Sequence, residues 1–368
     1  MANLERTILV TGATGKQGRA LIRALRPSSP SSTTNNNTDN TDNIDTNNPT
    51  TTTTPTSDFR ILALTRNPSS PTAQHLKSTE PHVQLVKGDL DDPDSVRKVF
   101  EDAGGKHSVW GVFMVLAFPG LGASAEGEEK QGKALADFAL EYEVVHFVFS
   151  SVERGGEEDE EKLVVDRAAK ARIEKHVLGL GEKGLNWTIL RPAFFMENLE
   201  GFIGKLTVSV LRAGLKPDTK IDLVATKDIG RMAAETFKRP ESSTHKIFTV
   251  TSDVLSISEM DAAHVRATGG KHLPSVPTFI GKFLLARNKV TQNLIADFER
   301  VHAKHSQDPA GRESYLAESR AFLPEMTSFE SWVKEQIAAK AQAKTKKGGE
   351  GSENWNKVSL WKLVTGRH

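Results

Sequence analysis

The sequence lacks cysteine altogether, holds only two tyrosines and has almost no net charge. Without cysteine there is no disulfide framework, no thiolate metal site and no catalytic thiol. Any redox function therefore depends on a bound cofactor. The 48 Lys and Arg residues balance 47 Asp and Glu residues, which argues against a surface built for nucleic acid. We expect no direct nucleic-acid partner.

Long apolar runs are also missing. The longest covers residues 109–118, which is about half of the roughly 20 residues that a membrane-spanning helix needs. The first residues lead directly into a strand-like segment and show no secretion signal. We therefore expect no membrane partner and a cytoplasmic location, with the nucleus as the alternative.

Two segments differ in composition from the rest of the chain. Residues 28–57 contain 23 Ser, Thr or Asn among 30 and a single aliphatic residue, Ile44. They bury too little apolar surface to offset the entropy of ordering, so we predict a disordered insertion. Residues 339–368 carry seven Lys or Arg against two Glu. This basic tail is either a solvated terminus or a docking segment for an acidic or nucleic-acid partner.

The remaining chain alternates strand-like and helix-like segments. Apolar runs occur at 6–11, 60–65, 83–87, 109–115, 144–150 and 186–190, with helical patterns between them. Continuous apolar strands are typical of parallel sheets covered on both faces. We predict a doubly wound, Rossmann-type α/β domain formed by residues 1–27 and 58–191. A smaller substrate-side region at 192–338 follows it.

The strongest motif is the glycine-rich segment GATGKQG at 12–18, between the first strand and the first helix. In a Rossmann fold the first glycine permits the tight turn and the second lets backbone amides approach a pyrophosphate. The third lets helix and strand pack closely. We therefore predict that the dinucleotide is bound by Gly12, Thr14, Gly15, Lys16, Gln17 and Gly18.

The end of the second strand discriminates between NAD and NADP. An NAD site places an acidic residue there, whereas an NADP site supplies a cation for the 2′-phosphate. Here the strand ends in TRNP at 65–68, so we predict Arg66 as the 2′-phosphate ligand and Lys16 as a second cation. After the third strand we place Asp89 and the adjacent Leu90 at the adenine. A helix cap is the alternative role for Asp89.

These motifs and others further along the chain resemble the NmrA-like branch of the atypical short-chain dehydrogenase/reductases. The resemblance is carried by TGATGKQG, TRNP, KGDLDD, HFVFSSVE and ILRPAFFMENL, at 11–18, 65–68, 87–92, 146–153 and 189–199. It implies a Rossmann domain that binds NADP(H) and a substrate cleft formed partly after the last motif. Members include oxidoreductases and catalytically silent regulators that sense the NADP(H) state and bind proteins such as transcription factors. The insertion and the acidic run at 157–161 depart from the family's pattern.

Conventional short-chain dehydrogenases use a Tyr-x-x-x-Lys pair, in which the lysine helps the tyrosine to exchange a proton with the substrate oxygen. That pair is absent, because Asp166 stands four residues before Lys170 and both Tyr142 and Tyr315 lie elsewhere. The resemblance aligns Lys170 with a lysine that NmrA-like proteins and plant isoflavone-type reductases place near the nicotinamide ribose. Lys170 either bridges the ribose hydroxyls, donates a proton in a reduction, or lies on a solvated helix face.

Other candidate residues belong to the fifth strand and to the last motif. Ser150 and Ser151 end the fifth strand, where short-chain dehydrogenases place a substrate-orienting hydroxyl; a cap of the strand end is the alternative. We predict that Ser151, Phe194 and Asn198 line the substrate pocket and that His146 is a core histidine. The scattered histidines show no metal-binding spacing, and no Gly-x-Ser-x-Gly elbow indicates a hydrolase.

The sequence leaves two functions open. In the first, the chain is an NADP(H)-dependent oxidoreductase that reduces a small organic substrate, with Lys170 as its polar catalytic group. In the second, it is a non-catalytic NADP(H) redox sensor that regulates a protein partner such as a transcription factor. The missing tyrosine favours the sensor hypothesis, whereas Lys170, Ser150 and Ser151 are consistent with the enzyme hypothesis.

Overall fold

The computed structural model describes residues 6–26, 59–116, 126–156, 163 and 165–345 of the chain. The predicted insertion, the acidic run and all but the first few residues of the basic tail lie outside these ranges. The strands are β1 (Arg6–Val10), β2 (Phe59–Thr65), β3 (Val83–Lys87), β4 (Gly111–Met114), β5 (His146–Ser150), β6 (Trp187–Pro192), β7 (Phe194–Phe195), β8 (Ile221–Val224), β9 (Lys246–Val250) and β10 (Asp253–Leu255).

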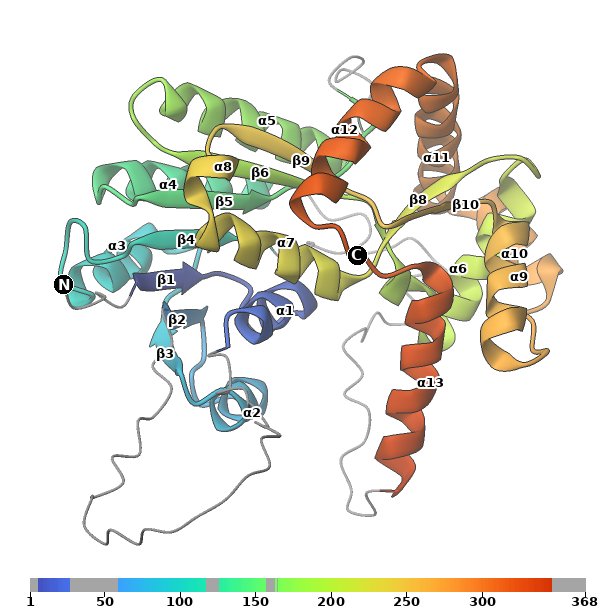
Figure 1. Ribbon diagram of the computed structural model, residues 1–368, viewed down its shortest axis with the longest axis horizontal. Helices are drawn as coiled ribbons and strands as arrows, with labels where there is room; N and C mark the ends of the chain where they lie inside the picture. The colour runs from blue at the N-terminus through green and yellow to red at the C-terminus, as the bar shows by residue number, and fades with distance from the viewer. Residues whose placement is uncertain (1–5, 27–58, 117–125, 157–162, 164, 346–368) are drawn as a thin grey trace, which may run out of the picture.

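Helices follow most of these strands (Figure 1). They are α1 (Lys16–Ala24), α2 (Pro71–Thr79), α3 (Pro93–Asp102), α4 (Glu126–Glu141), α5 (Val165–Gly181), the 3-10 helix η2 (Met196–Leu199), α6 (Gly201–Gly214), α7 (Thr226–Lys238), α8 (Pro240–Ser243), α9 (Ile257–Thr268), α10 (Thr278–Arg287), α11 (Lys289–Gln307), α12 (Pro309–Phe322) and α13 (Phe329–Thr345).

The main sheet has seven strands in the order β3-β2-β1-β4-β5-β6-β9. Every pairing in it is parallel, from Arg6 opposite Phe59 at one side to Pro192 opposite Val250 at the other. The first six strands follow the order of the doubly wound dinucleotide-binding fold. The predicted fold class is therefore confirmed.

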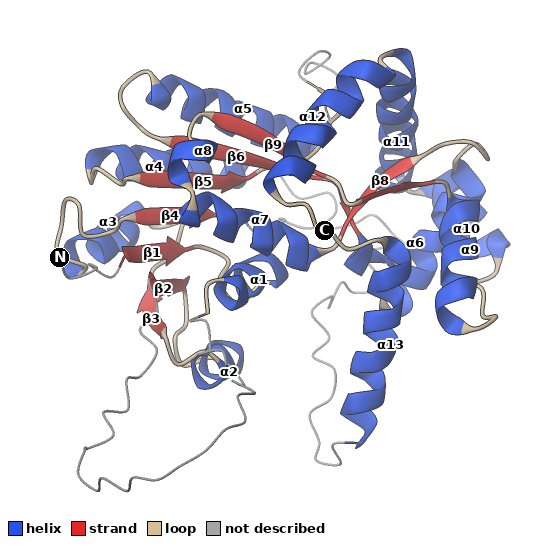
Figure 2. Cartoon of the chain, viewed as in Figure 1, coloured by secondary structure: helices blue, strands red, loops and turns tan. Residues whose placement is uncertain are grey.

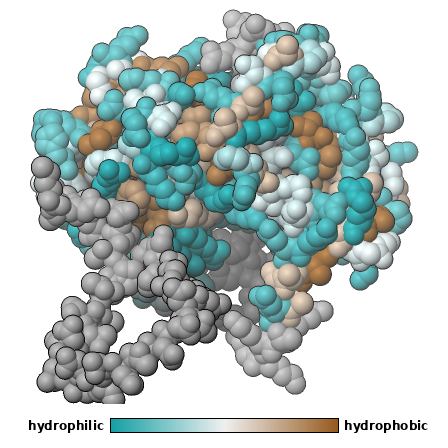
Figure 3. Space-filling model, in the orientation of Figure 1, coloured by the Kyte–Doolittle hydropathy of each residue, from teal (hydrophilic) through white to brown (hydrophobic). Residues whose placement is uncertain are grey.

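Helices cover both faces of the sheet (Figure 2). One core joins the sheet to α1, α2 and α7, with Leu21 and Ile229 among its fully buried members. The other joins it to α3, α4 and α5, with Phe100 and Ile173 among its fully buried members. The face seen in Figure 3 is mostly hydrophilic, with hydrophobic residues in small groups. The apolar strand runs read from the sequence are therefore buried from both sides.

The residues after 192 contribute to two separate layers. A small sheet, β10-β8-β7, packs with η2, α6, α9, α10, α11 and α13 around a third core. Residues 226–250 instead return to the main sheet, because β9 pairs with β6 and α7 packs on α1. That contact is close: a Cβ on Gly230 would lie 2.3 Å from the backbone of Ala20. The predicted substrate-side region thus also supplies an edge strand to the Rossmann sheet.

The helix boundaries have local causes. Ser70 and Asp92 accept hydrogen bonds from the backbone N–H groups of Ala73 and Ser95, and a proline follows each cap at the first helical position. No helix in the described ranges is long and apolar enough to cross a membrane.

Candidate cofactor and substrate site

The turn between β1 and α1 leaves an open helix N-terminus at the carboxyl end of the sheet. Gly12 has a left-handed φ of +55°, and a Cβ on Gly18 would lie 2.4 Å from the carbonyl oxygen of Gly12. Gly15 occupies the N-cap position, no side chain caps the helix, and its first turn holds no acidic residue. Thr14 lies half-buried between these glycines. The free backbone N–H groups and the helix dipole therefore suit an anionic group such as a pyrophosphate.

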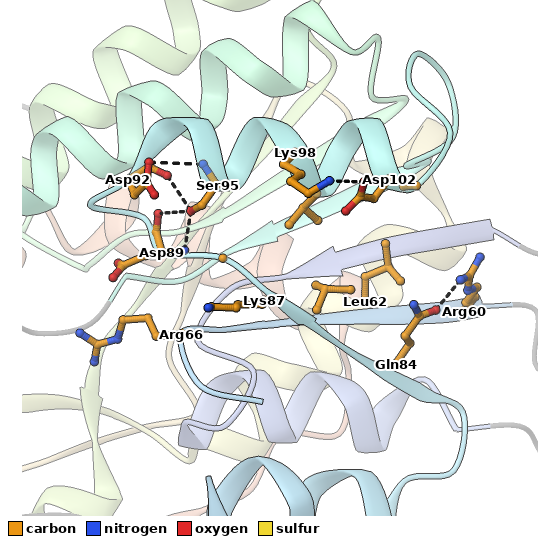
Figure 4. A pocket seen from close by; sticks show the side chains of 14 residues that line it. Arg60, Leu62, Arg66, Gln84, Lys87, Asp89, Asp92, Ser95, Lys98 and Asp102 are labelled. Carbon is orange, nitrogen blue, oxygen red and sulfur yellow. Dashed lines mark hydrogen bonds and ion pairs between the residues drawn. The ribbon is translucent and has the colours of Figure 1, made fainter. Parts of the chain in front are cut away.

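A second cation site lies at the adjacent ends of β2 and β3. Arg66 and Lys87 are both exposed, and they line one end of a groove of about 630 Å³ between these strands and α3. Figure 4 shows both side chains at the strand ends, apart from the Lys98–Asp102 ion pair along the groove. Among the described residues, neither the Arg66 side chain nor the Lys87 side chain has a hydrogen-bond or ion-pair partner. The pair is available for a phosphate.

The two residues predicted at the adenine occupy the loop after β3. Asp89 lines the same groove, and its carboxylate accepts a hydrogen bond from the backbone N–H of Asp91 at 3.1 Å. The cap of α3 is Asp92, so the alternative role considered for Asp89 is wrong. Leu90 packs partly buried against the core on the α3 side. Of the two residues predicted at the adenine, Asp89 is therefore the polar one that lines the groove.

Lys16 does not line the groove that holds Arg66. Its ammonium lies 3.6 Å from the carboxylate of Glu200 and 3.5 Å from the carbonyl oxygen of Glu197, on the other side of the glycine turn. Lys87, which the sequence analysis did not select, stands beside Arg66 instead. The parallel register explains this, because Lys87 pairs with Thr65, the residue before Arg66.

A mostly apolar cavity of about 550 Å³ opens beside the glycine turn. Gln17 and Ser150 meet in its wall, where the Ser150 hydroxyl donates to the Gln17 amide oxygen at 2.6 Å. Ser151 also lines the cavity, is 5% exposed, and has a buried hydroxyl oxygen with no hydrogen-bond partner among the described residues. A buried hydroxyl of this kind normally has a partner. The Ser151 hydroxyl is therefore available to hydrogen-bond to a molecule bound in the cavity.

Lys170 lines the same cavity from α5. Its ammonium forms an ion pair with Glu128 of α4, and both side chains are largely buried, at 15% and 2% exposed. The second carboxylate oxygen of Glu128 is buried and has no recorded partner. Of the three roles considered for Lys170, a freely solvated position is wrong. The ion pair holds the ammonium at the cavity wall.

The segment that ends the last sequence motif forms another wall of the cavity. The ring of Phe194 is half-buried and meets Phe298 of α11 edge-on, with centroids 5.3 Å apart. Asn198 is exposed and lines the cavity. Between them Glu197 caps α7, accepting from the backbone N–H of Thr226 at 3.0 Å, and burial raises the pKa of its carboxyl group. The structure thus brings Gln17, Ser151, Lys170, Phe194 and Asn198 to one cavity.

Charged residues fasten α11 over the far end of the cavity. His305 lies 3.1 Å from Asp222 and 3.7 Å from Glu153, two carboxylates that line the cavity. Burial lowers the pKa of His305, but the hydrogen bonds to Asp222 and Glu153 outweigh it and raise the pKa to about 8. Arg167 of α5 lies 2.7 Å from Asp297 of α11. These ion pairs join α11, which forms the roof of the cavity, to Glu153 after β5, to β8 and to α5.

His146, by contrast, belongs to the core as predicted. It is fully buried in β5, and its Nε2 lies 3.2 Å from the hydroxyl of Thr188. Burial, with a smaller effect of the charge on His245, lowers the pKa of His146 to about 4.

The profile of the NmrA-like family matches residues 50–333. The chain belongs to the NmrA-like family. It is 22% identical over 263 residues to an NmrA-like family domain-containing protein of Dictyostelium discoideum, covering 69% of this chain and 74% of that protein. It is 27% identical over 233 residues to the NmrA-like family domain-containing oxidoreductase cpsB of Aspergillus campestris, covering 58% and 66%. The resemblance noted in the sequence is therefore confirmed.

Solved structures with a similar fold include a regulator and a reductase. Nmra, a negative transcriptional regulator crystallised with NAD, is 18% identical with a TM-score of 0.60, covering 93% of this chain and 98% of that one. A triphenylmethane reductase of Citrobacter sp., complexed with NADP(H), is 16% identical with a TM-score of 0.59, covering 90% and 99%. At such identities the likeness establishes the shared fold.

Several functional candidates in this NmrA-like chain escaped the sequence analysis. Glu128 lies 42 positions before its partner Lys170, and nothing in the local sequence marks the pairing. His305 and Asp222 meet only because α11 folds back over β8. Lys87 had a detectable signal, since adjacent parallel strands end side by side and the residue at each end faces the same edge.

Proposed function

We propose that this NmrA-like chain binds NADP(H). The open N-terminus of α1 with Gly12, Gly15 and Gly18 suits the pyrophosphate. Arg66 and Lys87, with no carboxylate at the end of β2, suit a 2′-phosphate. Solved relatives of this fold that were crystallised with NAD, NADP and NADP(H) support the assignment.

We further propose that the chain reduces a carbonyl, imine or activated double bond of a small organic molecule. The observation that carries this proposal is the cavity, which places the buried, unpartnered hydroxyl of Ser151 and the ammonium of Lys170 in one mostly apolar wall. Bound NADPH supplies the hydride in such a reaction. Ser151 orients the acceptor atom of the substrate, and Lys170 donates a proton or hydrogen bond to it.

The cavity also restricts the class of substrate. Its volume of about 550 Å³ is within the range of sites for drug-sized molecules. Val115, Phe194, Leu206 and Phe298 are among the apolar residues that line it. We therefore expect an uncharged, largely apolar molecule with one polar group directed at Ser151 and Lys170.

The enzyme assignment is tested by turnover of quinones, aldehydes and ketones with NADPH. We expect oxidation of NADPH with at least one apolar substrate and its loss in Lys170→Ala. Arg172→Ala is the matched control, because Arg172 lies on the same helix but pairs with Glu129 at the surface. Turnover that survives in Lys170→Ala would contradict the role given to this lysine.

A specific observation favours the second candidate, a non-catalytic NADP(H) sensor that regulates a protein partner. Among the described residues no tyrosine side chain lines the cavity. Tyr142 is stacked on Phe100 in the core, with ring centroids 4.9 Å apart. A sensor binds NADPH and NADP with clearly different affinities and turns over no substrate. Calorimetric titration with NADPH, NADP and NADH, beside the turnover assay, separates the two functions.

A further inference from the structure

Helix α10 carries aromatic and basic side chains together on its outer side. Phe279 and Phe283 are 71% and 50% exposed, and Lys282 and Arg287 are exposed beside them. Spacings of three and four residues place these positions on one side of a helix. We call the four residues Phe279, Lys282, Phe283 and Arg287 the α10 face.

The neighbouring helix α6 also exposes an aromatic and a basic side chain. Phe202, in the first turn of α6, is 52% exposed, and Lys205 is exposed one turn later. The two helices pack closely, because a Cβ on Gly281 would lie 2.3 Å from the carbonyl oxygen of Ser209. The Ser209 hydroxyl also donates to the carbonyl oxygen of Val276 at 2.7 Å. The α10 face therefore belongs to a fixed two-helix unit, at the edge of the molecule in Figure 1.

Part of the positive charge of this unit is not neutralised, although Arg212 and Lys216 pair with Asp261 and Glu299. Residues 201–217 and 262–296 contain no Asp or Glu at all. Within the described ranges no ion pair is recorded for Lys205, Lys282 or Lys289, and the guanidinium of Arg287 lies over the ring of Phe283 at 5.7 Å. Lysines elsewhere commonly have partners, as Lys334 has in Glu330. The surface attracts a partner that carries negative charge.

The inner sides of the same helices line the apolar cavity. Ile203 and Leu206 of α6 and Leu284 of α10 are among its lining residues. A docking surface on the outer sides therefore lies one helix thickness from the proposed substrate site.

We propose that the α10 face, with Phe202 and Lys205, docks on an anionic lipid surface. Exposed aromatic rings insert at the boundary between headgroups and acyl chains, while Lys and Arg attract anionic headgroups. A double-stranded nucleic acid, bound through its phosphates, would use the cations but leave three phenylalanines in water. A second copy of the same face would bring like charges together. Lipid accounts for both the aromatic and the basic residues.

This proposal revises one expectation from the sequence. A membrane partner was excluded there on the length of apolar runs, a criterion that concerns spanning segments only. Peripheral docking needs single exposed side chains that folding brings together.

Sedimentation of the full-length protein with phosphatidylcholine vesicles, with and without phosphatidylserine, tests the proposal. We expect binding only to vesicles that contain phosphatidylserine, weakened by added salt. Phe279→Ser/Phe283→Ser should weaken binding at least tenfold. Lys282→Gln/Arg287→Gln should weaken it roughly 25-fold, at about fivefold for each cation near the surface. Circular dichroism confirms that the variants remain folded.

Matched control variants test whether vesicle binding is specific to this surface. Ile337→Ser removes an apolar side chain that is 44% exposed on α13, and Lys77→Gln/Lys130→Gln removes two exposed cations from α2 and α4. Both should bind as the unchanged protein does. Failure to bind the anionic vesicles would overturn the proposal, whether or not the protein binds polyglutamate as a substitute for an acidic protein. Unchanged binding by Phe279→Ser/Phe283→Ser would also overturn it, because the contact would then lie elsewhere, for example on the basic tail.

Discussion

The ion pairs of His305 make a pH-dependent contribution to the stability of the cavity roof. His305 of α11 contacts Asp222 of β8 and Glu153 after β5, and Asp222 also pairs with Arg312 of α12. The imidazole of His305 helps to neutralise these carboxylates only when it is protonated. Raising the pH removes that charge and leaves two largely buried carboxylates; Asp222 keeps its ion pair with Arg312, and the guanidinium of Arg167 contacts the backbone of Glu153. We predict that the roof, and with it the fold, becomes less stable.

The size of the effect follows from the pKa. A group whose pKa is raised on folding contributes stability that is complete below its unfolded pKa and is lost as the pH rises through its folded pKa. For His305 these values are 6.5 and about 8. The difference corresponds to about 2 kcal/mol in the free energy of unfolding, lost between about pH 6.5 and pH 8.5. His146 acts in the opposite direction and in a different window, because its pKa is lowered to about 4. Its contribution is lost only as the pH falls below 6.5.

Urea unfolding at closely spaced pH values measures this contribution. The unchanged protein should lose about 2 kcal/mol between pH 6.5 and 8.5, whereas His305→Gln should show a flat profile across the same window. His272→Gln is the control, because His272 also pairs with a carboxylate but is 77% exposed. If His305→Gln and the unchanged protein lose stability in parallel above pH 6.5, the imidazole does not hold the roof and the reasoning is refuted.

Two further predictions concern the cofactor and substrate sites. Arg66→Ala should lower the affinity for NADP relative to NAD roughly 10- to 100-fold, the value of one or two charge-assisted hydrogen bonds; Lys98→Ala, in the same groove but paired with Asp102, should leave the ratio of dissociation constants unchanged. Glu128→Gln should release Lys170 from its position and lower kcat with the substrate found by screening on the order of 10- to 100-fold. Glu129→Gln breaks ion pairs at the surface on the same helical turn and should leave kcat unchanged. Equal losses of kcat in both variants would count against a positioning role for Glu128.

The Rossmann half of the molecule could be predicted from the sequence because its signals are local. Each strand of the main sheet up to β6 is a short apolar run, and the glycine turn lies directly between β1 and α1. Proline and cap residues set the starts of α2 and α3 within a few positions. Such signals depend only on residues that are close together in the sequence, so they can be interpreted without knowledge of the tertiary structure.

The substrate half could not be predicted to the same depth, because long-range contacts determine it. Strand β9 is as apolar as the earlier strands, but nothing in its composition shows that it pairs with β6 rather than with β8. The Lys170–Glu128 pair joins two helices, and the buried hydroxyl of Ser151 became informative only once its surroundings were known. A spacing rule finds residues near each other in the chain, whereas this cavity is assembled from segments as far apart in the chain as Gln17 and Val301.

The same division explains how one fold can serve both functions considered for this chain. The cofactor end is formed by backbone geometry at Gly12 and Gly18 and by cations at two strand ends, features that a sensor and an enzyme need equally. The cavity end is lined in part by α6, α10 and α11, and the ion pairs of His305 and Asp297 hold α11 in place. The inner side chains of these helices line the cavity, and outer side chains of α6 and α10 form the proposed docking surface. Substrate and docking partner can therefore change through these helices, whereas the groups proposed for catalysis, Ser151 and Lys170, belong to the Rossmann half.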